Sequence, residues 1–456
     1  MKNKKRKSSL ITHVDLFAGC GGLSLGMEQA GFTPVFVNEL DYDALNTYKV
    51  NRDHSLGGLP FNENELLHNR NIRSLDKNKL NDLKSNLLSL GIGIHFERNG
   101  RSNIDLVSGG PPCQGYSGIG HRRSYSVEKN KISSNRLYSH MVRVIRFLKP
   151  RIFMFENVRG LLTSRWTSSG NKGEIWNSVW KCFNDLAKKE GYALRYTLLY
   201  SKNYGVPQNR PRVIMVGIRE DIVNSSSLLY PDTHVEDAVA CNFLPMSKPN
   251  SFPHIEEVLG DLVDPDILEV LNTGEYQPGP FQTTEYANSI KKGSIQNYFR
   301  KTKDGTRVME IGELVTDHLY SKHKKNVVEK FNYMLNNNGH IPEKYKTKKF
   351  SQRVLPSQWN GRGPTITIAS LPDDYIHFSQ PRSLTVREWA RLQMFPDWYQ
   401  FKGNRTTGGL RRAGNPREKI TDRELPKYTQ IGNAVPVALA KAIGDHFREI
   451  LSDSIA

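Results

Sequence analysis

Short apolar segments alternate with helical stretches from about residue 11 to residue 220, and this alternation restricts the possible fold more than any other feature. The apolar segments are rich in Val, Ile, Leu and Phe, as expected for strands that are buried on both faces. Strands and helices in regular alternation are typical of βαβ units. The sequence therefore predicts an α/β fold with a parallel sheet covered by helices on both faces. Strands are expected at 12–18, 33–40, 104–110, 151–158, 193–200 and 212–218, and helices at 22–30, 135–148 and 174–190.

This alternation stops after Arg219, and the charge of the chain changes there. Acidic residues dominate 221–290, whereas Lys and Arg dominate 291–370. The change predicts a second, smaller domain whose basic half can face a phosphate backbone. Beyond it we expect a helix at 385–395, a Gly- and Arg-rich loop at 402–417 and a last helical stretch at 428–444.

The overall charge points to the kind of partner. A formal net charge of +18 favours a polyanion, and nucleic acid is the commonest one in cells. Residues 1–10 are expected to form a flexible basic arm. No apolar run reaches the length of a membrane span, and no signal peptide is expected. The four cysteines form no CxxC pair, so neither a zinc site nor a disulfide framework is indicated, and a reduced, cytoplasmic setting is expected.

The first expected strand runs into a glycine-rich sequence, DLFAGCGGLSLG (15–26). Glycines let a strand-to-helix turn bring its backbone N–H groups close to a ligand. Glu39 follows Gly19 by about twenty residues, at the end of the second strand, where an acidic side chain can hold ribose hydroxyls. Ser24 stands where nicotinamide enzymes have the third glycine of GxGxxG. A tight turn without a ligand is the alternative at this point.

Three further segments carry side chains suited to catalysis. Cys113 lies in GGPPCQGYS (109–117), where glycines and prolines stiffen a turn and present the thiol. Glu156 lies in ENV at the end of another strand, on the sheet edge where ligands bind in such folds. Arg210 and Arg212 lie two residues apart, on one side of an entering strand, where they can clamp a phosphate or a base. An inert cysteine, a helix-capping glutamate and surface salt bridges remain the alternatives.

Seven blocks occur in a fixed order: DLFAGCGG, NELD, GGPPCQGYS, ENV, QNRPR, PRSLTVREWARLQ and QIGNAVP. This set closely resembles the DNA (cytosine-5)-methyltransferases of bacterial modification systems. The resemblance covers 12–220 and roughly 364–450, and it leaves 221–363 as the stretch that varies in that family. It implies a doubly wound, Rossmann-like, S-adenosylmethionine-dependent methyltransferase domain plus a smaller target-recognition domain. The implied limits are 1–10 for the arm, 11–220 for the catalytic and cofactor-binding domain, 221–423 for the target-recognition domain, and 424–456 for a C-terminal helix that returns to the catalytic domain.

The resemblance implies methyl transfer from S-adenosylmethionine to C5 of a flipped cytosine in a specific double-stranded DNA sequence. Cytosine C5 is a poor nucleophile, so a thiolate must first add to C6 and make the ring enamine-like. By resemblance Cys113 is that nucleophile, Glu156 contacts N3 and the exocyclic amine, and Arg212 holds O2. Arg210 is expected in the same catalytic set. The base must leave the duplex for this reaction.

S-adenosylmethionine is the implied cofactor, and no metal is expected. The residues implied to bind the cofactor are Phe17, Gly19, Cys20, Gly22, Glu39, Leu40, Asn71, Ile72, Pro112, Leu137, Asn433 and Ala434. Asn71 departs from the family, which usually has Asp there, although an amide oxygen can accept the same hydrogen bond. The residues expected to contact DNA are Gln114, Ser117, Arg300, Arg353 and Thr367. Further polar side chains suited to base edges are Gln296, Asn297, Gln352, Gln358 and Asn360.

The implied partner is double-stranded DNA, bound by a monomer, and a cognate restriction endonuclease acting on the same sequence is compatible with the family. Three other functions stay open. A transfer-RNA cytosine-5-methyltransferase on the same scaffold is disfavoured by the long region 221–363. A non-catalytic DNA-binding module is disfavoured because Cys113, Glu156 and Arg212 are all present. A nicotinamide-dependent enzyme is disfavoured by Ser24. The recognised DNA sequence cannot be read from these residues.

Overall fold

The computed structural model describes residues 10–90, 92, 104–112, 136–167, 169–230, 234–249, 251–263, 285, 286, 288–291, 293–321, 323–346, 352–358, 364, 374–406 and 424–454. The chain forms two compact units. The first contains Met1–Tyr200, Pro211–Ser247 and Leu439–Ala456, and the second contains Ser201–Arg210 and Lys248–Ala438.

The limits of these units differ from the expected domain limits at three places. Residues 201–210, expected in the catalytic domain, group with the second unit. Residues 221–247 group with the first unit, where Glu236 and Ala238 exchange backbone hydrogen bonds with Tyr196. Residues 424–438 group with the second unit, where the Gln393 side chain donates to the Ile431 carbonyl. Packing defines these units, whereas the expected limits came from composition and motif order. The division of function between the two parts of the chain stays a prediction.

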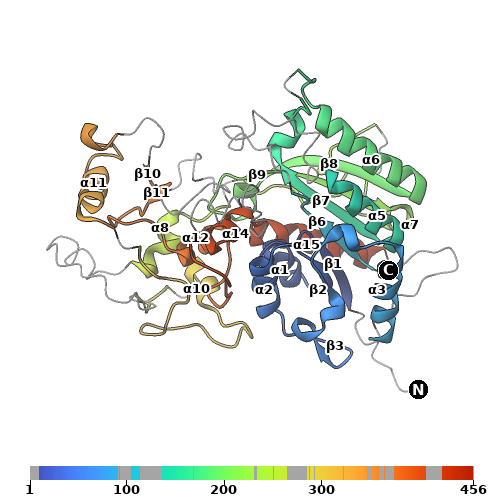
Figure 1. Cartoon of the computed structure of the whole chain (residues 1–456), viewed down its shortest axis with the longest axis horizontal. Helices are drawn as coiled ribbons and strands as arrows, with labels where there is room; N and C mark the ends of the chain where they lie inside the picture. The colour runs from blue at the N-terminus through green and yellow to red at the C-terminus, as the bar shows by residue number, and fades with distance from the viewer. Residues whose placement is uncertain are drawn as a thin grey trace, which may run out of the picture. The chain divides into compact units, whose positions relative to one another are not determined.

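A sheet forms the centre of the first unit. In the described part of the chain it has seven strands in the order β5-β2-β1-β6-β7-β9-β8 (Figure 1). The strands are β1 (Ile11–Leu16), β2 (Phe32–Asn38), β5 (His68–Asn69), β6 (Leu106–Gly109), β7 (Ile152–Val158), β8 (Tyr192–Tyr200) and β9 (Pro211–Arg219). A separate hairpin joins β3 (Ser55–Leu56) to β4 (Leu59–Pro60).

All six expected strands are confirmed, but the expected parallel arrangement is wrong for one of them. β9 runs antiparallel to both of its neighbours, β7 and β8. The reason lies in the short connection 201–210 between β8 and β9. A parallel return needs a crossover of about a dozen residues or more, usually through a helix, whereas a short connection favours a hairpin. The α/β class is therefore confirmed, with an antiparallel hairpin at one edge of the sheet.

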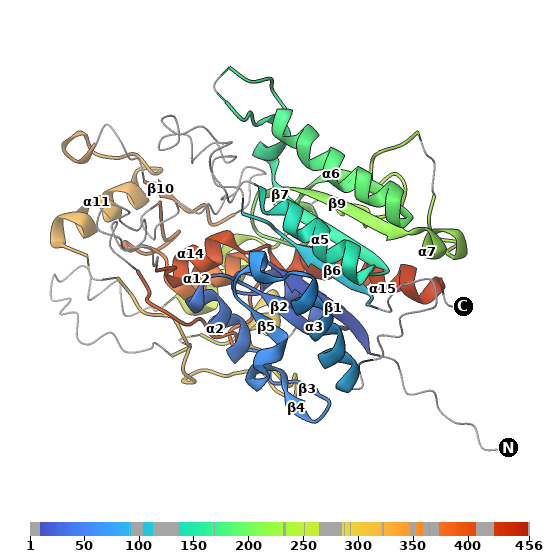
Figure 2. The ribbon, with the colours of Figure 1, turned by 45° about the vertical axis from the view of Figure 1, so that its right-hand side comes forward.

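Helices cover both faces of this sheet. Their bounds are α1 (Gly22–Gln29), α2 (Tyr42–Val50), α3 (Lys77–Ser89), α5 (Tyr138–Leu148), α6 (Glu174–Glu190), α7 (Glu220–Ser225) and α15 (Val437–Asp453). α5 and α6 pack together on one face, and α15 lies on the other (Figure 2). Gly444 of α15 leaves no space for a side chain beside Ala30 and Met27, so α15 and the end of α1 are in close contact.

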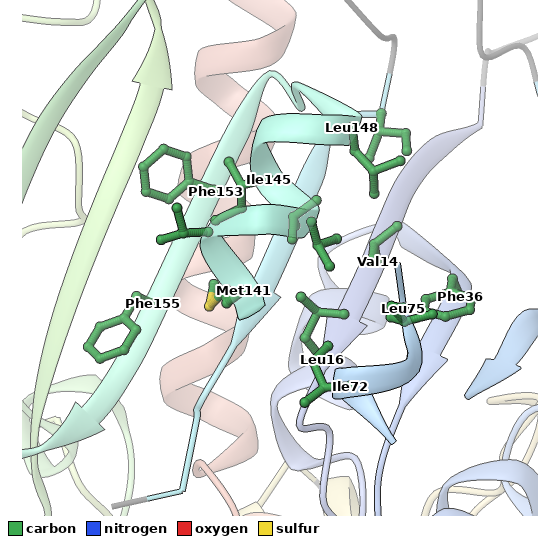
Figure 3. Packing of buried hydrophobic residues seen from close by; sticks show 14 of the residues in the cluster. Val14, Leu16, Phe36, Ile72, Leu75, Met141, Ile145, Leu148, Phe153 and Phe155 are labelled. Carbon is green, nitrogen blue, oxygen red and sulfur yellow. The ribbon is translucent and has the colours of Figure 1, made fainter. Parts of the chain in front are cut away.

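The hydrophobic core of the first unit lies between the sheet and these helices. α5 places Met141, Ile145 and Leu148 over the strands β6 and β7 (Figure 3). Phe153 and Phe155 of β7 stand two positions apart, and both rings pack against Phe183 of α6. Apolar residues three to four positions apart put one face of α5 on the sheet.

The second unit contains short elements. They are α8 (Ile255–Leu259), α10 (Ile295–Arg300), α11 (Lys325–Asn336), β10 (Arg353–Val354), β11 (Tyr375–Ile376), α12 (Val386–Leu392) and α14 (Lys427–Asn433). β10 and β11 pair in parallel. α12 begins with a capping box in which Thr385 and Glu388 satisfy each other's backbone N–H groups, as the expected helix at 385–395 requires. None of the described helices in either unit is long and apolar enough to cross a membrane.

Buried ion pairs hold the second unit together. Arg391 contacts Asp261 at 2.5 Å and Asp397 at 2.6 Å, and all three side chains are at most 1% exposed. A buried guanidinium is stable only when its donors are satisfied by charged partners in good geometry. Asp261 precedes Arg391 by 130 residues, so this cluster fastens the variable stretch of the chain to α12.

Candidate active site

The expected site residues of the first unit follow the carboxyl ends of neighbouring strands. In the register of the sheet, Leu16 of β1 pairs with Asn38 of β2 on one side and with Gly109 of β6 on the other. Gly109 in turn pairs with Phe155 of β7. The residues after these positions therefore lie along one edge of the sheet. The strand order reverses between β1 and β6, and crevices at such reversals are where open α/β sheets bind ligands.

The glycine-rich turn after β1 has an unusual backbone. Phe17, Gly19 and Gly21 have φ angles of 57°, 58° and 87°, all in the left-handed region. Phe17 is not a glycine, so its conformation costs about 1–2 kcal/mol and requires support from its surroundings. A Cβ built on Gly19 would have no atom within 4 Å. The turn therefore exposes backbone beside an open space in the first unit.

Glu39 is joined directly to this turn. Its carboxylate accepts hydrogen bonds from the backbone N–H of Gly19 at 2.8 Å and from that of Asp41 at 2.8 Å. Burial raises the pKa of Glu39 above its usual value, and the two N–H donors oppose that shift. Each carboxylate oxygen has a second lone pair, so Glu39 can still accept from ribose hydroxyls.

The other expected cofactor residues of the first unit differ in exposure. Leu40 is 63% exposed, whereas Ile72 and Leu137 are buried. Gly22 and Cys20 are buried, and burial raises the pKa of Cys20 to about 12, so this thiol stays protonated. Asn71 is exposed, and its side-chain oxygen accepts from the N–H of Arg73 at 3.1 Å. Pro112 is exposed at the end of the described part of its loop.

The loop after β6 is held against the end of β7. A Cβ on Gly110 would lie 2.7 Å from Oε2 of Glu156, so any side chain there would displace the carboxylate. The side-chain amide of Asn157 donates to the Pro111 carbonyl at 3.1 Å. Sequence reasoning missed Asn157, although it stands inside the ENV block. Cys113, Gln114 and Ser117 lie outside the described residues.

Glu156 and Arg212 form a close ion pair. Nε of Arg212 lies 2.6 Å from Oε1 of Glu156, and both side chains are about nine-tenths buried. The antiparallel pairing of β7 with β9 brings the two residues together, because Val158 pairs with Arg212 and Ile214 with Glu156. A carboxylate and a guanidinium thus lie beside the backbone that leads to Cys113.

Arg210 has a different position from the one expected. It is 2% exposed, and its guanidinium donates to the carbonyl of Gly432 in the second unit at 2.7 Å. This contact uses a guanidinium donor of Arg210 to hold a carbonyl, and the expected place of Arg210 in the catalytic set stays a prediction. Arg210 precedes β9, which begins at Pro211, so the alternation of a strand does not yet apply to it.

A cluster of amides surrounds the same end of α14. The Gln208 side chain donates to the Leu392 carbonyl and to the Gln393 side chain, and Gln393 donates to the Ile431 carbonyl at 2.9 Å. Asn433, which is exposed, and Ala434, which is buried, come directly after this segment. Sequence reasoning missed both glutamines, although they stand in the QNRPR and ARLQ blocks. Their amides fix the segment that carries two expected cofactor residues.

The expected DNA contacts separate into two groups. Arg300 is 1% exposed, pairs with Asp261 at 2.7 Å and stacks on the ring of Tyr286. These contacts argue against the expected DNA contact of Arg300, because its Nε and Nη2 donate inside the unit to Asp261 and to the Asn288 carbonyl. Arg353 is exposed and its guanidinium lies 4.4 Å from the ring centroid of Tyr375. Thr367 lies outside the described residues.

The additional polar residues also differ in availability. Gln358 is exposed and donates to Glu256 at 3.3 Å, whereas Gln352 is buried and accepts from the ammonium of Lys330. Gln296 and Asn297 are half-buried in α10. Asn360 lies outside the described residues. Arg353 and Gln358 are thus the exposed members among those that the structure describes.

Comparison with known proteins gives the same result along most of the chain. The sequence profile of the family "C-5 cytosine-specific DNA methylase" matches residues 11–449. The chain is 29% identical to the type II methyltransferase M.DdeI of Desulfomicrobium norvegicum, over 95% of this chain and 87% of that protein. It is 28% identical to the type II methyltransferase M.BsuRI of Bacillus subtilis, over 96% of this chain and 79% of that protein.

A solved structure shares the fold. It is a prophage-encoded protein of Escherichia coli described as a DNA modification methyltransferase, with a TM-score of 0.61 and 22% sequence identity. The alignment covers 97% of this chain and 99% of that one.

Proposed function

This chain belongs to the C-5 cytosine-specific DNA methylase family, and we propose which of its residues carry out the reaction. The protein is a DNA (cytosine-5)-methyltransferase, and S-adenosylmethionine is its methyl donor. The observation that carries the assignment of residues is the position of the Glu156–Arg212 ion pair. It adjoins Gly110, at the start of the loop that contains Cys113.

The edge of the sheet in the first unit fits S-adenosylmethionine. The cofactor carries a ribose diol and a positively charged sulfonium, and the turn after β1 offers open space at Gly19 beside the Glu39 carboxylate. We assign the ribose hydroxyls to Glu39 and the adenine to Leu40, Asn71 and Ile72. Phe17, Gly19, Cys20, Gly22, Pro112 and Leu137 complete the proposed pocket in the first unit. Asn433 and Ala434 remain expected cofactor contacts. When bound, the cofactor supplies an electrophilic methyl group.

Cys113 is the proposed nucleophile. Its thiolate adds to C6 of a cytosine that has left the duplex, and the ring electrons move toward N3. Glu156 accepts a hydrogen bond from the exocyclic amine, and in its protonated form it gives its proton to N3 as C6 is attacked. After C5 is methylated, a water molecule takes the C5 proton, the thiolate is expelled and N3 returns its proton to Glu156, which restores the aromatic ring. The enzyme thiolate is regenerated in each cycle.

Arg212 has a double role in this proposal. Its ion pair with Glu156 fixes the carboxylate before the base arrives, and its remaining donors can hold O2 of the cytosine. Fixed charges at the position where charge develops lower the barrier because they need no reorganisation during the reaction. The packing of Glu156 against Gly110 explains why this loop begins with glycine: a larger residue would push the carboxylate away from its place.

Recognition of the DNA sequence is assigned to the variable stretch 221–363 in this proposal. The exposed, ring-stacked Arg353 is suited to bind two acceptors in one plane, as the major-groove edge of guanine presents them. Gln114, Ser117 and Thr367 remain proposed contacts to DNA, and the enzyme is proposed to act on double-stranded DNA as a monomer. Its setting is proposed to be the bacterial cytoplasm.

The relatives named above as type II methyltransferases support a finer proposal. We propose that this protein is the modification enzyme of a restriction-modification system. Its methylation then protects DNA from an endonuclease of the same specificity. Digestion of the methylated DNA with endonucleases that cut the identified sequence tests this: protected sites are expected, and complete cleavage at methylated sites contradicts it.

Bisulfite sequencing of DNA from cells that express the protein tests the proposed function. We expect 5-methylcytosine at one defined sequence with the natural protein and none with Cys113→Ala. Methylation by Cys113→Ala would contradict the assigned nucleophile. The same measurement on transfer RNA separates the two substrates, because modified transfer RNA with unmodified DNA would favour the alternative substrate.

A further inference from the structure

A buried polar cluster lies directly beneath the proposed cofactor turn, and the proposed reaction does not use any of its side chains. Its centre is Asp15, near the end of β1, which is fully buried. Ser24 of α1 donates to Oδ2 of Asp15 at 2.7 Å. Ser108 of β6 pairs with Asp15 in the sheet register, and its hydroxyl lies 3.5 Å from Oδ1. One carboxylate thus faces two hydroxyls from two different elements.

Two outer side chains determine the direction of these hydrogen bonds. The Tyr48 hydroxyl lies 2.7 Å from the Ser24 oxygen, and Nε2 of His13 lies 2.7 Å from the Ser108 oxygen. Burial lowers the pKa of His13 to about 3, so its ring is neutral and carries one N–H. When Asp15 is ionised, each serine donates its single proton to Asp15 and accepts one from its outer neighbour. A buried carboxylate needs such donors to remain charged.

Arg52 extends the cluster to the turn itself. Its guanidinium lies 3.6 Å from the ring centroid of Tyr48 and donates to the carbonyl of Gly21 at 3.2 Å. The same guanidinium pairs with Glu28 of α1 at 2.8 Å. Arg52 is 2% exposed, so these contacts are shielded from water. The Arg52 guanidinium thus fixes the carbonyl of Gly21, a glycine with a left-handed backbone in the proposed cofactor turn.

We propose that Asp15 is a positioning residue that holds the cofactor turn through Ser24 and the strand leading to the Cys113 loop through Ser108. Ser24 is the third residue of α1 and lies in its first turn, so its bond to Asp15 sets the entry of α1. Ser108 precedes Gly110 by two residues, so its contact with Asp15 sets the start of the loop. This inference rests on the proposed cofactor site at Gly19 and Glu39. It also explains why Ser24 stands where a dinucleotide-binding turn has glycine.

A second pair in the same two strands provides a matched control. Thr12 of β1 and Asp105, just before β6, exchange hydrogen bonds of 2.8 to 3.0 Å through a hydroxyl, a carboxylate and two backbone groups. Both residues are about as buried as Asp15 and Ser24. They lie at the opposite ends of the strands, away from the turn and the loop. Thr12→Ala therefore removes comparable hydrogen bonds without changing the contact of Asp15 with Ser24 or with Ser108.

The experiment compares Ser24→Ala, Ser108→Ala and Thr12→Ala in the full chain. S-adenosylmethionine affinity is measured by calorimetry without DNA, and the methyl-transfer rate in a single turnover with both substrates saturating. We expect Ser24→Ala to weaken cofactor binding about tenfold and Ser108→Ala to slow the single turnover about tenfold, since misplacement of reacting groups is costly. Thr12→Ala should leave both quantities within about twofold of the natural protein. Asp15→Asn, which keeps the side-chain volume, should change both.

The outcomes separate the positioning role from simple loss of stability. If all three variants lose binding and rate alike, the cluster only stabilises the fold and the inference is overturned. The inference is also overturned if Ser24→Ala binds S-adenosylmethionine as tightly as the natural protein and Ser108→Ala transfers the methyl group as fast. Glu39→Ala tests the site on which the inference rests: if that variant keeps its affinity, the proposed cofactor site fails first. If Glu39→Ala binds the cofactor weakly while Asp15→Asn keeps the affinity and rate of the natural protein, the proposed cofactor site is supported. Only the inference about Asp15 is then overturned.

Discussion

Replacing Arg212 by methionine should destabilise the first unit through the carboxylate it leaves behind. Nε of Arg212 lies 2.6 Å from Glu156, and the two side chains are 10% and 11% exposed. Removing one member of a buried ion pair typically costs 3–5 kcal/mol, because the other charge stays buried without a partner. Because both side chains keep some contact with solvent, we expect Arg212→Met to lower the free energy of unfolding by about 3 kcal/mol, the lower end of this range.

A double-mutant cycle in urea measures this effect. We expect Arg212→Met and Glu156→Gln each to lower the free energy of unfolding, while the double variant recovers to within about 1–2 kcal/mol of the natural protein. Trp176 and Trp180, which pack near Tyr196 on β8, report unfolding of this unit by fluorescence. All three variants should lose methyl transfer, so stability and activity respond differently.

An exposed ion pair in the same unit serves as the control. Lys49 contacts Glu65, whose side chain is 77% exposed, and Lys49→Met should therefore cost less than about 1 kcal/mol. If Arg212→Met were as stable as Lys49→Met, with a coupling energy near zero, the buried pair would not exist in solution. The preorganised carboxylate at the centre of the proposed mechanism would then have to be abandoned.

Four further substitutions test separate parts of the molecule. Glu39→Ala should weaken S-adenosylmethionine binding roughly 10- to 100-fold in calorimetry, because it removes a charged acceptor, and unchanged affinity would mean that the ribose is held elsewhere. Burial raises the pKa of Asp15 to about 7 from 3.8, so between these pH values the folded state keeps a proton that the unfolded chain has lost. The contribution of Asp15 to the free energy of unfolding therefore falls as pH rises from about 4 to 7. Urea titrations at several pH values should show that Asp15→Asn removes a slope of up to about 1.4 kcal/mol per pH unit from the free energy of unfolding. Arg300→Met should lower the free energy of unfolding by about 3 kcal/mol and leave the methylated sequence unchanged. Arg353→Ala should fold normally and weaken discrimination between bases at one position of that sequence by roughly 1–3 kcal/mol. Bisulfite sequencing that found relaxed specificity in Arg300→Met alone would reverse these two assignments.

Six strands of the sheet were predictable because buried strands need continuous apolar runs, whereas β5 is only two residues long and contains no apolar residue. The turn after β1 and the acidic Glu39 were also predictable, since a turn of glycines followed by an acid at that distance has few other uses. The structure joins these two features by a direct hydrogen bond from Gly19 to Glu39. The direction of β9 could have been inferred as well, from the short connection that precedes it.

Which arginines are buried and which are exposed was not predictable from the sequence. Arg300 and Arg353 both stand in the basic half of the variable stretch, yet one is buried on Asp261 and the other is exposed on Tyr375. The partner of a buried charge is set by tertiary contacts between distant segments, and Asp261 lies 39 residues before Arg300. A charge count therefore overestimates the number of side chains that are available to DNA.

The buried cluster around Asp15 was hidden for a similar reason. In the sequence, Ser24 appears only as a departure from a glycine pattern, and Ser108 appears as a polar residue inside an apolar strand. Their common partner becomes apparent only when β1, β6 and α1 are in place. Polar residues at buried strand positions are a signal that could have been used, because such groups require a hydrogen-bonding partner.

Covalent trapping on DNA tests the central claim most directly. A duplex with 5-fluorocytosine at the methylated position of the identified sequence is mixed with the protein and S-adenosylmethionine, then denatured and analysed by mass spectrometry. Because fluorine at C5 cannot leave as a proton does, the natural protein should remain joined to the DNA through Cys113, with one methyl group added to the base. Cys113→Ala should give no adduct. An adduct at another residue, or none with the natural protein, would contradict the proposed mechanism.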